Sequence, residues 1–408
     1  MNTIGFEYVK LVLRVGQYDA DYIDAYFGPD EWRPKGDLPA DTAQALNELL
    51  SETHALQNEL RQTKTSGFND LSLRRHRYLT KQLIAVECKI RMLQGERFSF
   101  DEESRSLYDA VAPTYDEKHF EVLLTELDKL LPGSGELSKR LESFRSNFII
   151  PKDKLDVVFS AAIEEGRRIT KKHIPLADSE SFLVEYVTDK PWSGYNWYKG
   201  KSHSVIQVNT DFPISIERAV DLACHEGYPG HHVYNALLEQ HLAVEQNWPE
   251  FRVYVLFSPQ SFIAEGSANY GIEAAFSPDA RIRFEKEVLF PLAGLDSSKA
   301  DEYYQVLAVT AKLNYAGNEA ARGYLNGTMS KEDAIAWLQK YSLSSKERAE
   351  QRIRFIDKYR SYVINYNWGL DLVRNYVDKQ SGGEEAKRWQ VLEELLSRPF
   401  VPSELVQK

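Results

Sequence analysis

The chain has 408 residues, of which 43% are hydrophobic and 27% charged, so it can bury a sizeable core as one large globular unit or two smaller ones. The 61 acidic and 50 basic residues give a net charge of −11, which is unlike a nucleic-acid-binding protein, and no nucleic-acid partner is expected. The two cysteines, Cys88 and Cys224, are too few for a disulfide framework and favour a reducing compartment.

Membrane association is not expected from the sequence. No stretch approaches the ~20 apolar residues that a membrane-spanning helix needs. The segment 1–22 lacks the basic head and the apolar stretch of a signal peptide. We therefore predict a cytoplasmic protein with no membrane partner, while the sequence leaves the oligomeric state open.

The first third of the chain is predicted to consist of helices. Four are expected, over 41–60, 70–95, about 117–131 and from about 151 past 168. Asp41 and Gln44 have the spacing of a capping box at the start of the first helix, and Gly95 is placed as the C-terminal stop of the second. We interpret these segments as scaffold.

Two short segments near the middle of the chain are predicted to be strands. Residues 182–188 and 203–209 are rich in β-branched and aromatic side chains. The loop between them, 190–200, contains a proline, two glycines and several aromatic residues, so a small hairpin or antiparallel sheet is expected. A helical pattern returns after 213 and dominates after about 280.

The segment with the clearest chemistry is Asp221–His232, with the sequence Asp-Leu-Ala-Cys-His-Glu-Gly-Tyr-Pro-Gly-His-His. Three of the nine histidines lie in one eight-residue stretch of this segment, 225–232, and a glutamate directly follows the first of them. In many zinc peptidases the motif His-Glu-x-x-His on a helix places two imidazoles on one side and the glutamate beside a reactive water. Here a proline, Pro229, stands where the second histidine of that motif would be.

The spacing of the histidines requires an irregular helix. His231 and His232 follow His225 by six and seven residues, and seven residues advance about 10 Å along a straight helix. Zinc ligands approach the ion to about 2 Å, so a straight helix cannot supply both imidazoles. Pro229 and Gly230 favour a break, and we predict that it returns His231 towards His225. His232 is the alternative second ligand, and a plain turn between helices is the alternative interpretation.

Glu265 is the predicted third ligand. It lies among small and apolar residues in the segment 261–273, where a buried carboxylate is costly unless it is paired or bound to a metal. Zinc hydrolases use three protein ligands and leave a fourth position for water. The small residues would also let this helix approach its neighbour closely. A surface carboxylate, or a pair with an arginine, is the alternative for Glu265 alone; together with His225 and His231, metal ligation is favoured.

Three segments carry a resemblance to a known family. They are 194–211, the run Cys-His-Glu-Gly-Tyr-Pro-Gly-His-His at 224–232, and the run Ala-Glu-Gly-Ser-Ala-Asn-Tyr at 264–270. These segments resemble a largely uncharacterised bacterial family with a His-Glu-x-x-Pro-Gly-His-His motif and a downstream Glu-Gly. That family is distantly similar to gluzincin metallopeptidases such as thimet-type oligopeptidases and helical metallocarboxypeptidases.

The resemblance implies a mainly helical fold in which zinc is held by His225, His231 and Glu265. It also implies that Glu226 is the catalytic base. The usual family form continues as Glu-Gly-Trp-Ala, whereas this chain has Ser267 in place of the tryptophan. That difference leaves the implied metal ligand in place and removes any inference about the adjacent subsite.

The expected mechanism is hydrolysis by a metal-activated water. Zinc lowers the pKa of a bound water and polarises a carbonyl, and Glu226 would transfer the proton to the leaving amine. The tetrahedral intermediate needs a further donor, for which Tyr324 is the predicted catalytic residue. Tyr315 is a second candidate, and we assign it to substrate binding. Arg322 is predicted to bind a substrate carboxylate. Ordinary helix packing is the alternative role for all three.

Supporting roles are predicted for two carboxylates. Asp221, one turn before His225, is placed to orient an imidazole, and Glu273, two turns after Glu265, is an alternative. Each could instead be solvated or in a surface pair. The segment 359–366 offers further tyrosines and an arginine of the same chemical kinds as the predicted donors.

The strand at 203–209 is predicted to be an edge strand beside the metal, where it could pair with an extended peptide substrate. The aromatic residues Trp192, Tyr195, Trp197 and Tyr198 could line subsites, and Tyr198 is the one that we assign to substrate binding. A structural hairpin with these aromatic side chains packed inward is the alternative.

These observations predict a mainly α-helical, metallopeptidase-like bundle with a small antiparallel sheet beside the active-site helix. A single domain, 1–408, is expected, with a helical scaffold at 1–175, the sheet and metal-site helices at 176–280, and C-terminal helices that close the cleft at 281–408. The predicted function is zinc-dependent cleavage of peptide bonds in short peptides, with carboxypeptidase action as one form. The alternatives are metal-dependent hydrolysis of a non-peptide amide or ester, and a non-catalytic helical binding module.

Overall fold

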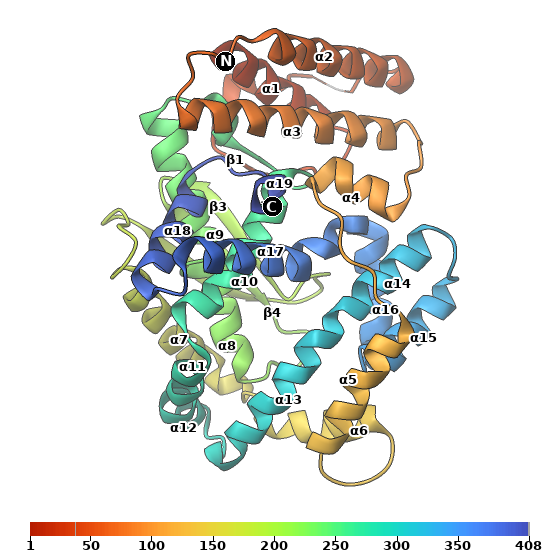
Figure 1. The fold of residues 1–408 in the computed structure, drawn as a ribbon, viewed down its shortest axis with the longest axis vertical. Coiled ribbons are helices and arrows are strands. Elements are labelled where there is room, and N and C mark those ends of the chain that lie inside the picture. The colour runs from red at the N-terminus through yellow and green to blue at the C-terminus, as the bar shows by residue number, and fades with distance from the viewer. Residues whose placement is uncertain (37, 407–408) are drawn as a thin grey trace.

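The computed structural model describes residues 1–36 and 38–406, and it is mainly α-helical, as predicted (Figure 1). None of the helices in these two ranges combines the length and the hydropathy needed to cross a bilayer. The N-terminal helices are α1 (Asn2–Val15), α2 (Thr42–Gln62), α3 (Asp70–Leu93), α4 (Phe100–Tyr108), α5 (Glu117–Leu130), α6 (Leu137–Arg145) and α7 (Leu155–Thr170).

The predicted signals at the helix ends are present in part, because Asp41 caps α2 whereas the Gln44 side chain donates to Glu48 and does not complete a capping box. The side chain of Asp41 accepts a hydrogen bond from the backbone N–H of Gln44 at 2.9 Å and so caps α2. Gly95 follows the end of α3 with φ of +92°, a left-handed conformation that glycine adopts without steric cost. Helices α1, α2 and α3 lie side by side at the top of the view in Figure 1.

The middle of the chain holds the short helices and the strands. The helices are α8 (Glu217–Leu222), α9 (His231–Leu238) and α10 (Pro259–Ala275), and the strands are β1 (Ile23–Tyr26), β2 (Ser181–Val187), β3 (Gly194–Gly200), β4 (His203–Asn209) and β5 (Val253–Val255). Strands β1 and β5 pair in an antiparallel ribbon that joins the N-terminal part to the middle of the chain. This ribbon was not predicted, because its strands are short and far apart in the sequence.

The larger sheet is mixed, which corrects the prediction of an antiparallel one. Its order is β2-β4-β3, with β4 antiparallel to β3 and parallel to β2. The segment predicted as an aromatic loop contains β3, which pairs with β4 through the two-residue turn Lys201-Ser202, both with positive φ. Because that hairpin occupies one edge of β4, β2 pairs with the other edge, and β4 is central.

The C-terminal part is helical, as predicted. Its helices are α11 (Pro278–Phe284), α12 (Phe290–Ala293), α13 (Ala300–Lys312), α14 (Ala316–Leu325), α15 (Lys331–Tyr341), α16 (Lys346–Tyr359), α17 (Ile364–Ser381), α18 (Glu385–Ser397) and α19 (Pro402–Leu405).

Helix α10 lies at the centre of the molecule and crosses α17 (Figure 1). Its residues belong to both apolar core clusters, for example Phe262 to one and Ala275 to the other. The crossing is close, since a Cβ on Gly266 would lie 2.5 Å from the carbonyl oxygen of Gly369. The predicted close approach of this small-residue helix is therefore confirmed, and it places Glu265 deep in the protein.

Candidate metal centre

The His-Glu motif lies where one helix ends and the next begins. Helix α8 continues into a π-helical turn, η4 (Ala223–Gly227), and α9 starts at His231. Between them the backbone N–H of Gly230 donates to the carbonyl of Cys224 at 2.9 Å. A Cβ on Gly230 would lie 1.9 Å from the carbonyl oxygen of His225, so glycine is required there. The predicted interruption of the helix is present.

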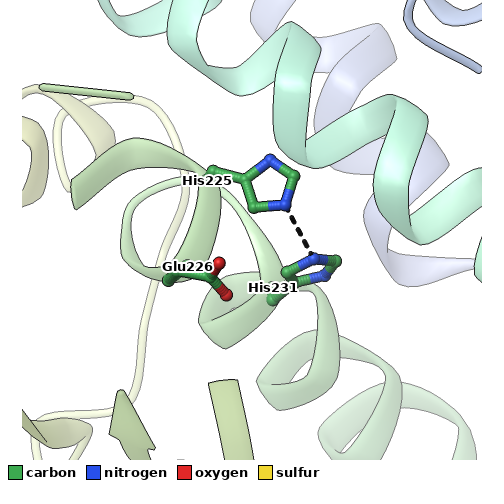
Figure 2. A group of neighbouring side chains, drawn as sticks. All are labelled: His225, Glu226 and His231. Atoms are coloured by element: carbon green, nitrogen blue, oxygen red, sulfur yellow. Dashed lines mark hydrogen bonds between the residues drawn. The ribbon is translucent and has the colours of Figure 1, made fainter. Parts of the chain in front are cut away.

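This interruption brings three predicted ligands together. The Nε2 atoms of His225 and His231 are 3.1 Å apart, and Figure 2 shows this contact as the dashed line between the two rings. The Oε2 atom of Glu265, on α10, is 3.2 Å from Nε2 of His225 and 3.7 Å from Nε2 of His231. Three potential ligand atoms from two separate segments therefore meet at one point.

The distances between these three atoms fit the ligands of a zinc ion. Ligands of a tetrahedral zinc at about 2.0–2.1 Å lie about 3.3–3.4 Å from one another, close to the three separations in this cluster. Glu265 supplies an independent sign, since its Oε1 accepts from the Tyr362 hydroxyl at 2.8 Å while its buried Oε2 has no hydrogen-bond donor among the described residues. A buried carboxylate oxygen without a donor is costly, and a cation at this point would satisfy it.

The charges in the cluster are consistent with a ligand carboxylate. Burial alone would favour neutral Glu265, but His231 and His225 outweigh it and hold the pKa of Glu265 well below its usual range. Burial also opposes charge on His231, yet Glu265 outweighs it and raises the pKa of His231 to about 9. A metal cation at this position would stabilise the Glu265 carboxylate in place of the proton on His231.

Asn269 orients His225. Its Oδ1 lies 2.9 Å from Nδ1 of His225, and its Nδ2 donates to the backbone carbonyl of Tyr366 at 3.0 Å. Since the amide nitrogen is engaged by that carbonyl, Oδ1 is the acceptor and Nδ1 of His225 carries the proton. The lone pair of Nε2 then faces His231 and Glu265, as a metal ligand requires.

The predicted orienting carboxylates have other partners. Asp221 pairs with Arg281 at 2.8 Å and with Arg218 at 3.2 Å. Glu273 pairs with Arg374 at 2.5 Å. Both predictions of an orienting role are therefore wrong. Asn269 was missed, although its position one helical turn after Glu265 in the same small-residue helix could have indicated it.

The structure distinguishes the two adjacent histidines. His232 points away from the cluster, with its Nε2 3.2 Å from Oε2 of Glu180 and its Nδ1 2.8 Å from the Ser204 hydroxyl. His232 is fully buried in this network. Of the alternatives that the sequence left open, His231 is the one placed beside His225.

Glu226 lies beside the cluster. One ligand atom each from His225, Glu226 and His231 lies within 4.8 Å of the other two, and Figure 2 shows the carboxylate directed towards the side of the His231 ring. Glu265 is closer to both imidazoles, so we place Glu265 among the ligands and Glu226 next to them. Burial raises the pKa of Glu226, as suits a base that must bind a proton. A Cβ on Gly194 would lie 2.8 Å from its Oε1, so β3 passes directly beside the carboxylate.

A cavity of about 1100 Å³ opens from the cluster. The wall of this cavity contains His225, Glu226, His231 and Glu265, together with residues 194–196 at the start of β3. The remaining lining residues that matter for the chemistry are Tyr315, Arg348, Arg352, Tyr362 and Tyr366.

Three predicted site residues do not line this cavity. Tyr324 donates to Asp357 at 2.8 Å on α16. The guanidinium of Arg322 is held by Glu319 at 2.6 Å, by Asp101 at 3.2 Å and by a backbone carbonyl. The Tyr198 hydroxyl donates to Glu239, the first residue of the helical segment η5 (Glu239–Glu245). Each polar group is satisfied by a structural partner, so these residues are corrected to packing roles.

Tyr315 does line the cavity, and its hydroxyl donates to Asp371 at 2.5 Å. Tyr366 is the better-placed donor, and it lies in the segment 359–366 that the sequence left undecided. It lines the cavity, and its hydroxyl has no hydrogen-bond partner among the described residues. Burial, with the nearby charge of Glu265, raises the pKa of Tyr366 well above its usual value, so the hydroxyl keeps its proton.

No family model and no curated protein matches the chain. Several solved structures are similar to the chain, and two of them are as follows. A candidate lipoprotein from Colwellia psychrerythraea is 14% identical with a TM-score of 0.52, over 90% of this chain and 70% of that one. A candidate lipoprotein of unknown function from Shewanella oneidensis is 12% identical with a TM-score of 0.47, over 89% and 72%. The Colwellia structure supports a shared mainly helical fold and nothing about chemistry.

Proposed function

We propose that this protein is a zinc-dependent hydrolase that cleaves peptide bonds of short peptides. The observation that carries the proposal is the meeting of Nε2 of His225, Nε2 of His231 and the donor-less Oε2 of Glu265. These three residues would hold the ion. When bound, zinc polarises a carbonyl and activates water as a nucleophile.

Glu226 and Tyr366 are the residues that we assign to proton transfer and charge stabilisation. Glu226 accepts a proton from the attacking water and gives it to the leaving amine, and its buried position supports this role. Tyr366 donates its free hydroxyl to the oxygen on which negative charge develops. Tyr366 takes the donor role that the sequence had suggested for Tyr324.

The edge of the sheet supports a peptide as the substrate. Strand β3 is at an edge of the three-stranded sheet, and its residues 194–196 line the cavity beside Glu226. An extended peptide can pair with such an edge and so place its scissile carbonyl beside the candidate metal ligands and Glu226. Strand β4, for which we predicted this role, is central and has no free edge. A non-peptide amide or ester would use the same catalytic groups but not this edge.

The open side of the cluster favours catalysis over a structural metal site. A structural zinc is enclosed by four protein ligands, whereas a catalytic one keeps a position open. His232, the nearest candidate for a fourth protein ligand, is engaged by Glu180 and Ser204. The cluster faces a cavity instead. These contacts argue against the alternative of a non-catalytic binding module.

Metal analysis and one matched pair of variants test the proposal. We expect about one zinc per chain, an anomalous X-ray signal at the zinc edge beside His225 and His231, and peptidase activity that is lost on chelation and restored by zinc. Glu226→Gln should retain zinc but lose roughly 10²–10⁴-fold in activity. The control, Glu287→Gln, changes an exposed glutamate and should be unaffected. Full activity in Glu226→Gln would exclude Glu226 as the base, and a metal-free, zinc-insensitive protein would exclude the hydrolase.

We also propose a cytoplasmic location, which the unpaired and buried Cys88 and Cys224 support. The Colwellia structure is named as a lipoprotein, which would place the protein at a membrane instead. Fractionation of cells that express the tagged chain separates these outcomes: recovery with the membrane fraction contradicts a cytoplasmic location.

A further inference from the structure

One arginine in the cavity wall has no partner of its own. Arg352, on α16, is half-buried, and among the described residues no carboxylate lies within 4.0 Å of its guanidinium and no hydrogen bond engages it. Three other arginines of the cavity wall are paired: Arg145 with Glu217 at 3.2 Å, Arg218 with Asp221 at 3.2 Å, and Arg374 with Glu273 at 2.5 Å.

Among the described residues, an aromatic ring and a glycine lie beside the Arg352 guanidinium, and no carboxylate or hydrogen-bond acceptor compensates its charge. Its guanidinium carbon lies 5.1 Å from the centroid of the Phe355 ring, and a Cβ on Gly317 of α14 would lie 3.5 Å from Nη2. Burial lowers the pKa of Arg352, which means that its charged form is held at a cost. A charge kept unpaired in a cavity wall is suited to an anion that arrives with the ligand.

The position of Arg352 connects it to the metal cluster. The Phe355 ring is 6.3 Å from Tyr366, and Tyr366 is 5.7 Å from Tyr362, centroid to centroid. The Tyr362 hydroxyl donates to Glu265. A continuous row of aromatic side chains therefore forms the wall between Arg352 and the cluster, so an anion at Arg352 and a carbonyl at the cluster can belong to one short ligand.

A second arginine extends the positive charge towards the mouth of the cavity. Arg348 precedes Arg352 by one turn of α16, is exposed, and has no carboxylate within 4.0 Å among the described residues. Its guanidinium lies over Phe212, 4.5 Å from the ring centroid. Burial and then the charges of Arg145 and Arg218 lower its pKa. The two unpaired arginines share one helix face and the same cavity.

We propose that Arg352, assisted by Arg348, binds the C-terminal carboxylate of the peptide substrate, so that the enzyme removes residues from the carboxyl end. This inference rests on the proposed peptidase function and defines its substrate class as peptides with a free C-terminus. A guanidinium binds a carboxylate through two parallel hydrogen bonds, and a C-terminal amide cannot form that charged pair. Hydrolysis adds water across one peptide bond, with the hydroxyl going to the acyl carbon and a proton to the departing amine.

The first test compares a short peptide, Ala-Ala-Ala-Phe, with its C-terminal amide. We expect the zinc-loaded enzyme to prefer the free acid by at least tenfold in kcat/KM. Arg352→Gln should lose most of that preference through a lower rate on the free acid, with the amide unchanged. The matched control, Arg354→Gln, changes an exposed arginine of the same helix that does not line the cavity, and it should keep the preference. Equal rates on acid and amide in the wild type would overturn the proposal.

The second test measures binding without turnover. Zinc-loaded Glu226→Gln is titrated by calorimetry with the same acid and amide, with and without Arg352→Gln. We expect Arg352→Gln to weaken binding of the acid at least tenfold and to leave the melting temperature unchanged or higher, because an unpaired half-buried charge is removed. A lower melting temperature without a change in acid binding would assign Arg352 to the fold and overturn the proposal.

The two measurements separate this inference from the proposed function. Cleavage without an acid preference leaves the peptidase and removes the carboxylate site. Arg352-dependent binding of the acid by a protein that cleaves no peptide leaves the carboxylate site and removes the peptidase. An amidated peptide that ends in glutamate serves as a further probe: cleavage of it at the rate of the free acid would assign Arg352 to an acidic side chain and overturn recognition of the C-terminus.

Discussion

Nδ1 of His225 lies 2.9 Å from Oδ1 of Asn269, a residue one helical turn beyond Glu265 on the same helix. A single amide therefore links the two segments that supply the candidate ligands. It sets the proton on Nδ1 and leaves Nε2 as the atom that faces the cluster. The second bond of the amide, to the backbone of Tyr366, ties the same element to the wall that carries the candidate oxyanion donor.

Replacement of Asn269 should weaken zinc binding while the ligands remain. In Asn269→Ala nothing holds His225 in the ligand tautomer, and we expect a 10–100-fold loss of zinc affinity. Asn269→Asp keeps an acceptor at the same distance and should retain most of the affinity. Competition against a chromophoric chelator measures both. An unchanged affinity in Asn269→Ala would show that packing alone orients the imidazole.

The two adjacent histidines should give opposite results. His231→Ala removes a candidate ligand, so we expect loss of stoichiometric zinc and of zinc-dependent thermal stabilisation. His232→Ala should retain zinc but lower the free energy of unfolding by about 1–3 kcal/mol, because Glu180 and Ser204 lose a buried partner. Zinc content and denaturant unfolding distinguish the two variants. If His231→Ala retained zinc while His232→Ala lost it, our assignment of the second ligand would be reversed.

The crossing of α10 and α17 should not tolerate a methyl group. In Gly266→Ala the new Cβ would meet the carbonyl oxygen of Gly369 at 2.5 Å, so the helices must separate, at a cost of about 1–3 kcal/mol. Gly67→Ala is the control, because a Cβ there meets no atom within 4 Å, and it should change stability by less than about 0.5 kcal/mol. Chemical denaturation of both variants measures the difference. Equal stability would show that the crossing is loosely packed.

Glu180 should make the protein sensitive to acid. Burial opposes its charge, but hydrogen bonds from His232, Tyr228, Arg167 and Lys171 outweigh burial and lower the pKa of Glu180 to about 2. A carboxyl whose pKa is lower in the folded than in the unfolded chain stabilises the fold above the unfolded value of about 4.3. That contribution is lost as the pH falls towards 2.

Glu180→Gln tests this pH dependence. We expect the variant to be less stable than the wild type at pH 7, with the difference narrowing between pH 5 and pH 3, because the neutral amide has no proton to gain. Urea unfolding at a series of pH values measures the gap. A gap that is constant with pH would mean that the packing of Glu180, rather than its charge, stabilises the fold.

Sequence rules were sufficient where the determining interactions are local. The helix limits near Asp41 and Gly95 depend on capping and glycine conformation within one turn, and the structure has them. The break at Pro229 follows from the loss of a backbone donor and a clash within four residues. Chemistry and spacing also selected His225, His231 and Glu265, which the fold brings together.

The same rules failed where a side chain finds its partner far along the chain. Tyr324 meets Asp357, 33 residues away, and Arg322 meets Asp101, 221 residues away. Strand β2 pairs in parallel with β4 because the hairpin that follows it already occupies the other edge. Hydrophobic periodicity and residue propensity predict the local conformation of a segment and which of its faces is buried. They contain no information about which residue, distant in the sequence, a given side chain will contact.

The sequence by itself determined the helical class, the interrupted motif and the chemical identity of three possible ligands, because each depends on residue type and short-range backbone geometry. Tertiary packing alone decided that Asn269 orients His225, that His232 belongs to the Glu180 network, and that Arg352 faces the cavity unpaired. The physical reason is that a polar side chain acquires its role from the groups available where it is buried, and segments distant in the chain supply those groups.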